Sequence, residues 1–156
     1  LCYPAGTPKK KYNYSTGKPY PAFKKSWKKM FPERSINTGC DSFVNLVVKE
    51  CGYKGVPIGK SWSTQIEWYK KHFRCIVPKK QNGKILRNQF KAGDIVYWAK
   101  SDGSHHIYII VKDGKYRRRA EAVQHGLAGH KGDKWSHIGK GLNCDVHKVD
   151  YIFRAK

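Results

Sequence analysis

Residues 39–48 read GCDSFVNLVV, a change from a polar loop to an apolar run within a few positions. Apolar residues at 43, 44, 47 and 48 recur with the spacing of one helical face, so we expect a helix from about residue 40 to 51, ended by Gly52. Cys40 would then occupy the first turn, where backbone N–H groups lack intrahelical partners and the helix dipole is positive. Both effects favour the thiolate, which is the nucleophilic form, over the thiol. The alternative is that Cys40 is an inert buried thiol.

Two further helices are predicted on either side of this one. Residues 21–31 place apolar side chains on one helical face and lysines on the other, and residues 63–73 turn Ile66, Tyr69 and Phe73 inward. A basic amphipathic helix can lie on a membrane surface. One as short as residues 21–31 is expected to pack on the core instead.

From residue 91 onward the pattern indicates strands, which are rich in β-branched and aromatic residues. Strands are predicted at 75–77, 95–98, 106–111, 115–124 and 146–153, a turn at 81–84, and a loop at 125–143. Helices first and an antiparallel sheet afterwards predict the α+β class. We expect a basic arm and short helix at 1–32, packed on one catalytic domain at 33–156.

The net charge is +21, from 32 Lys and Arg against 11 Asp and Glu. Such a field favours polyanionic partners, namely nucleic acid, anionic lipid head groups or acidic wall polymers, although a lysine-rich solvated surface is the alternative. The basic residues are spread along the chain and form no single stripe, which argues against specific nucleic-acid binding. No apolar run approaches the length of a membrane span, and no signal peptide is visible in the sequence.

Five cysteines leave at least one thiol unpaired. In an exported protein Cys2, Cys51, Cys75 and Cys144 could form two disulfides and leave Cys40 free, whereas in a reducing compartment all five would stay reduced. The sequence leaves both possibilities open. A pair between Cys40 and Cys51 is excluded if the helix forms, because the two lie about three turns apart.

A base and an orienting group for Cys40 are predicted on the strands. His106 stands at the entrance of the central strand, where it could take the thiol proton and return it to a leaving amine. Glu121 on the next strand could hold the imidazole in the correct tautomer, and Gln124 and His125 are rivals for that role. The alternatives are a buried core histidine and a surface carboxylate.

Two segments that start the domain resemble a known family. Residues 39–44 (GCDSFV) resemble the nucleophile motif of NlpC-type cell-wall cysteine peptidases, which are papain-like in fold. Residues 93–98 (GDIVYW) resemble the Gly-Asp-hydrophobic-Val-Phe-Trp strand of the same family.

Two later segments follow in the family's order. Residues 106–114 (HIYIIVKDG) resemble the segment that begins with the catalytic histidine, which maps the base onto His106 and not onto His105. Residues 120–122 (AEA) resemble the segment that holds the third catalytic residue. The resemblance covers about residues 35–124.

The resemblance implies a papain-like NlpC-type fold, with helices packed on one antiparallel sheet and the nucleophile at a helix N-terminus. It implies hydrolysis of amide bonds in peptidoglycan stem peptides through a thiolate acyl-enzyme, often between D-γ-Glu and a diamino acid, with Cys40, His106 and Glu121 as catalytic residues. The chain departs from the family at Gly39, usually Asp, at Asp41, usually Ser, and at Glu121, usually His. No clear counterpart of the family's upstream tyrosine is present.

We therefore expect a secreted or cell-surface monomer that acts on stem peptides, with anionic wall polymers as further partners and neither a cofactor nor a metal. One alternative is an N-acetylmuramoyl-L-alanine amidase of the CHAP type. Another is a non-enzymatic nucleic-acid-binding module. A metal site would have to use the irregularly spaced residues of the His-rich segment, which are His125, His130, His137, Cys144 and His147.

Overall fold

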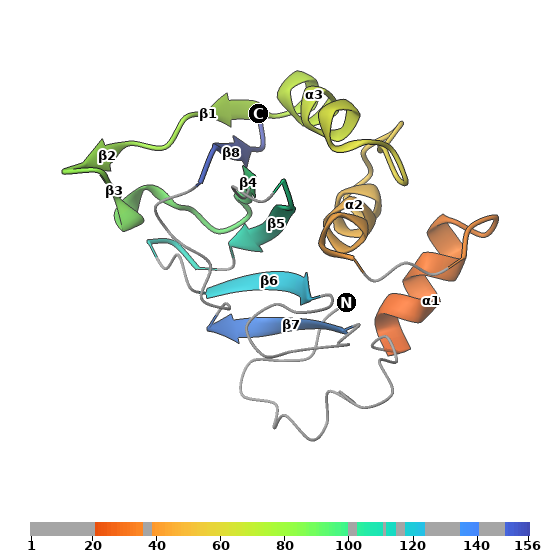
Figure 1. Cartoon of the computed structure of the whole chain (residues 1–156). Helices are drawn as coiled ribbons and strands as arrows, with labels where there is room; N and C mark the ends of the chain where they lie inside the picture. The colour runs from red at the N-terminus through yellow and green to blue at the C-terminus, as the bar shows by residue number, and fades with distance from the viewer. Residues whose placement is uncertain are drawn as a thin grey trace.

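The computed structural model describes residues 21–35, 39–99, 103–110, 112–114, 118–123, 135–140 and 149–156. Of these, residues 21–23, 87, 118–123 and 135–140 are described as backbone only. Within these ranges, three helices precede a six-stranded antiparallel sheet, and a two-stranded hairpin lies beside it (Figure 1). The α+β class predicted from the sequence is confirmed. The basic arm expected before residue 21 lies outside the described residues.

The three predicted helices form within two residues of their expected bounds. They are α1 (Pro21–Met30), α2 (Cys40–Glu50) and α3 (Trp62–His72). The start of α3 is capped by Ser61, whose side chain accepts a hydrogen bond from the backbone N–H of Thr64 at 3.3 Å. None of the described helices is long and apolar enough to cross a membrane.

The large sheet has the strand order β1-β8-β4-β5-β6-β7, and each neighbouring pair is antiparallel. The last strand, β8, therefore lies between β1 and β4. The strands are β1 (Arg74–Ile76), β4 (Ile95–Ala99), β5 (His105–Ile110), β6 (Arg118–Val123), β7 (Trp135–Lys140) and β8 (Tyr151–Arg154).

One predicted loop contains a strand. The range 125–143 was expected to be a loop because of its glycine, histidine and lysine content, yet Trp135–Lys140 forms β7 and pairs along the whole of β6. Pairing with a neighbour has overridden weak local propensity there. The turn predicted at 81–84 is confirmed, since β2 (Lys80–Gln81) and β3 (Lys84–Ile85) are joined by Asn82 and Gly83, both at positive φ.

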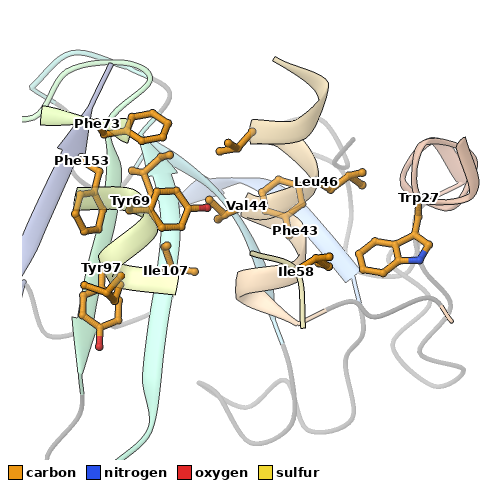
Figure 2. Packing of buried hydrophobic residues seen from close by; sticks show 13 residues of the cluster. Trp27, Phe43, Val44, Leu46, Ile58, Tyr69, Phe73, Tyr97, Ile107 and Phe153 are labelled. Carbon is orange, nitrogen blue, oxygen red and sulfur yellow. The ribbon is translucent and has the colours of Figure 1, made fainter. Parts of the chain in front are cut away.

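The strands β4, β5 and β8 are buried on both faces. On the helix-covered face, Tyr97 and Ile107 pack with α2 and α3, as Figure 2 shows. On the opposite face, Tyr108 and Ile110 pack with residues from the hairpin side and the end of the chain. The members of this second cluster are Ile85, Phe90, Val96, Trp98, Tyr108, Ile110, Val149 and Ile152.

The helix α1 packs against α2 through its apolar face, as expected. The Trp27 side chain is 1% exposed, and its Nε1–H donates to the backbone carbonyl of Arg34 at 3.1 Å. Its ring lies 5.0 Å from that of Phe31. The lysines of α1 are exposed on the other side: Lys24, Lys25, Lys28 and Lys29.

The described cysteines are free thiols, namely Cys40, Cys51 and Cys75. The structure therefore contains neither of the disulfides considered for Cys51 and Cys75. The other two cysteines, Cys2 and Cys144, lie outside the described residues.

Candidate active site

Cys40 is the first residue of α2, and it lies against the central strand of the sheet. The preceding Gly39 has an extended backbone and offers no capping side chain, so no side-chain oxygen competes for the N–H groups of the first turn. The Cys40 sulfur lies within hydrogen-bond reach of the backbone N–H of Ile107 on β5, as well as those of Asp41 and Cys40 itself. The predicted thiol at a helix start facing the sheet is therefore present.

The environment makes this thiol less acidic than expected. Burial raises the pKa of Cys40 to about 12, and the negative charge of Asp41 adds to the effect. The three N–H groups stabilise the thiolate and lower the pKa, but by less. The N–H groups favour the thiolate as expected, but desolvation acts in the opposite direction and is the larger effect.

His106 lies on the wrong face of β5 to act on Cys40. It is fully buried, its backbone pairs with Trp98, and its ring lies 6.4 Å from the Trp98 ring and 5.4 Å from that of Tyr108. These neighbours belong to the opposite face, whereas Cys40 lies over the helix-covered face at Ile107. The expectation that His106 faces the nucleophile is therefore wrong, since successive residues of a strand point to opposite faces.

His105, the residue before His106, lies on the helix-covered face of β5. Its ring stacks on Trp62 at the start of α3, with centroids 4.8 Å apart and planes 14° apart. Residues two apart on a strand share a face and lie about 7 Å apart, so His105 is next to Ile107, the residue whose N–H meets the Cys40 sulfur. An imidazole and a thiol are thus brought to one face of the sheet.

Tyr97 holds the other side of the His105 ring. Its hydroxyl oxygen lies 2.6 Å from Nδ1 of His105. Burial, together with the negative charges of Asp150 and Tyr151, raises the pKa of Tyr97, so the phenol stays neutral at neutral pH. When this oxygen accepts the Nδ1–H bond, the lone pair of His105 is on Nε2, the nitrogen free to act as a base.

Glu121 lies on β6, where its backbone pairs with His137. The register of β6 on β5 sets Ala120, and not Glu121, opposite Ile109 of the helix-covered face. The side chain of Glu121 is outside the described part, as are Gln124 and His125, the other residues considered for the orienting role. Tyr97 is the group that the structure shows bonded to His105.

A buried chain of hydrogen bonds fixes α3 on α2 beside these residues. Gln65 donates to Asp41 Oδ2 at 3.0 Å, Asn45 donates to Gln65 Oε1 at 3.0 Å, and Tyr69 donates to Asn45 Oδ1 at 2.7 Å. The chain holds the start of α3, and with it the Trp62 ring, in place over His105. The one signal for it in the sequence is Asn45, a polar residue inside an apolar helical run.

The side chains considered for a metal site all lie outside the described part of the structure. His125, His130, Cys144 and His147 lie outside the described residues, and His137 is described only as backbone of β7. Among the side chains that are described, no three or more His, Cys, Asp or Glu residues gather closely enough to hold a metal ion.

The fold and the site thus define an α+β protein with a cysteine at a helix start and a histidine on the face of the central strand that this helix covers. No protein-family model, curated protein or solved structure matches the chain.

Proposed function

We propose that the protein is a cysteine hydrolase of papain-like, NlpC-type architecture that cleaves amide bonds in peptidoglycan stem peptides. The observation that supports this most is the placement of Cys40 and His105 on one face of the sheet, with the thiol at a helix start. The motif order seen in the sequence supports the substrate class. The base differs from the one that the motif alignment gives, because the face of β5 selects His105.

Catalysis begins with transfer of the thiol proton to Nε2 of His105 as the Cys40 sulfur attacks the amide carbonyl. Because burial and Asp41 disfavour a resting thiolate, this transfer accompanies the attack and does not precede it. The backbone N–H groups at the start of α2 can donate to the oxyanion that forms.

The His105 imidazolium then gives its proton to the leaving amine, and an acyl thioester remains on Cys40. His105 next removes a proton from water, the hydroxide attacks the thioester, and the acid product leaves as the thiol is restored. Tyr97 and Trp62 act as positioning residues, since they fix the tautomer and the plane of the ring.

The net charge of +21 supports accumulation on anionic wall polymers, an effect that falls as salt rises. This partner and the substrate class support a location at the cell surface or outside the cell. Cleavage between the glycan and the first alanine, as in CHAP-type amidases, is the second candidate reaction. Both reactions use the same Cys40–His105 pair, and product masses distinguish them.

The test is digestion of purified muropeptides, followed by mass spectrometry of the products. The unaltered protein should release stem-peptide fragments, and Cys40→Ala should release none. Cys51→Ala is the matched control, because it removes an exposed thiol at the other end of α2 and should leave cleavage unchanged. Equal cleavage by the protein and Cys40→Ala would remove Cys40 from the mechanism.

The nucleic-acid alternative has its own signature. If the unaltered protein cleaves no muropeptide yet binds DNA with a steep dependence on salt, the basic-module interpretation replaces the hydrolase.

A further inference from the structure

A cavity of about 350 Å³ lies against the first turn of α2, on the side away from the sheet. Its walls include Trp27, Glu33, Arg34, Ser42, Ile58 and Gly59. Figure 2 shows the Trp27 indole and Ile58 beside α2. The volume falls in the range of sites that hold small ligands. The catalytic arrangement described above uses none of these residues.

The Arg34 guanidinium is seated on the backbone of Gly59. A Cβ atom at Gly59 would lie 2.7 Å from Arg34 Nη1, closer than real Cβ atoms come to another heavy atom, so a larger residue there would push the guanidinium aside. The backbone of Arg34 is also fixed, because its carbonyl accepts the hydrogen bond from Trp27 Nε1 at 3.1 Å. The backbone of Arg34 is therefore anchored beside the cavity, and its guanidinium lies at the cavity wall next to Gly59.

The cavity wall carries two opposite charges that do not neutralise one another. Glu33 and Arg34 both line the cavity, and the structure records no ion pair between these two described residues. Trp27 and Ile58 add apolar surface beside them. A guanidinium binds a carboxylate well, and a carboxylate binds an ammonium, so this wall suits a group that bears both.

We propose that this cavity binds the zwitterionic end of the peptide substrate, a residue with a free ammonium and a free carboxylate. Arg34 binds the carboxylate and Glu33 binds the ammonium. The inference rests on the proposed function, since it assigns a specificity site to the same enzyme.

The position of the cavity predicts where the cleaved bond lies. Ser42 and Cys40 are two residues apart on α2, which places them on roughly opposite sides of the helix and about 10 Å apart with their side chains. An extended peptide of about three residues covers that distance. The bond at Cys40 therefore lies about three residues from the zwitterionic end.

The test measures binding by calorimetry, with Cys40→Ala protein so that no hydrolysis occurs. The probes are a synthetic stem tripeptide that ends in a diamino acid, the same peptide with amidated carboxyl groups, and the same peptide with acetylated amino groups. We expect Arg34→Gln to weaken binding of the free peptide about tenfold and to leave binding of the amidated peptide unchanged. Glu33→Gln should behave in the same way toward the acetylated peptide.

Gly59→Ala is a second way to disturb the Arg34 guanidinium, because the added methyl group would displace it. Gly83→Ala is the matched control: its φ is +73° against +68° at Gly59, yet no atom lies within 4 Å of the added methyl group. We expect Gly59→Ala to bind like Arg34→Gln, and Gly83→Ala to bind like the parent.

Equal losses for the free and amidated peptides in Arg34→Gln, or no loss at all, would overturn the inference. If Gly59→Ala fails to fold, the Arg34→Gln comparison decides alone. If binding depends on Arg34 but the unaltered protein cleaves no peptide, the inference about the cavity stands and the proposed hydrolase is refuted. If the unaltered protein cleaves the peptide but binding does not depend on Arg34, the hydrolase stands and the inference about the cavity is refuted.

Discussion

Replacing Asp41 by asparagine should make Cys40 more acidic and faster to alkylate. The negative charge of Asp41 is the second cause, after burial, of the raised pKa of the Cys40 thiol. Asparagine removes the charge but keeps the oxygen that accepts the hydrogen bond from Gln65 at 3.0 Å. The substitution therefore changes the electrostatics of the thiol with little change in packing.

The size of the effect follows from Coulomb's law. Two charges roughly 6 Å apart repel by about 1–3 kcal/mol at an effective dielectric constant between about 20 and 40. That energy corresponds to a fall of about one to two units in the pKa of Cys40. At a fixed pH well below the pKa, each unit raises the thiolate fraction, and with it the alkylation rate, about tenfold.

The assay is iodoacetamide labelling of Cys40 over a range of pH, with the labelled residue quantified by peptide mass spectrometry. Glu67→Gln is the control, because it removes one exposed carboxylate from α3 and does not act on Cys40. Labelling of Asp41→Asn at the rate of the unaltered protein would refute the reasoning, since the charge next to the thiol would then have no influence on it.

Three further outcomes follow from the site. Tyr97→Phe removes the partner of His105 Nδ1, so kcat should fall about tenfold to a hundredfold with KM unchanged; a change confined to KM would contradict the positioning role. The Cys40 thiol keeps its proton in the folded state above its ordinary pKa of 9.0, so the free energy of unfolding should fall by up to about 1.4 kcal/mol per pH unit above about pH 9. Urea unfolding should show a smaller alkaline loss in Cys40→Ala, and identical losses would argue against the burial. Gln65→Leu leaves Asn45 and Asp41 without that partner and should lower the free energy of unfolding by about 1–3 kcal/mol; an unchanged urea midpoint would contradict a structural role for this chain.

The helices could be predicted because each has a local signature. Apolar spacing, Pro21 at the start of α1 and Gly52 after α2 are all properties of short stretches, and tertiary contacts agree with them. The strand β7 could not be predicted in this way, since it exists through its pairing with β6.

The face of β5 could not be predicted either. Ile107 and Ile109 face the helices while Tyr108 and Ile110 face the other cluster, so apolar residues occur at every position and no alternation marks the helix-covered side. Because His105 and His106 are adjacent at the strand entrance, the sequence could not show which of the two lies on the face toward Cys40. The raised pKa of Cys40 could not be predicted for a related reason. The position of Cys40 at a helix start can be predicted from the sequence, whereas its burial depends on tertiary packing.

The most direct test of the Cys40–His105 pair compares two neighbouring variants. Muropeptide cleavage should be measured for His105→Ala and for His106→Phe, which keeps a ring of similar size in the buried site, with rates normalised to folded protein. The account predicts that His105→Ala loses cleavage by about a hundredfold or more while His106→Phe still cleaves. Full cleavage by His105→Ala, with none by His106→Phe, would contradict it.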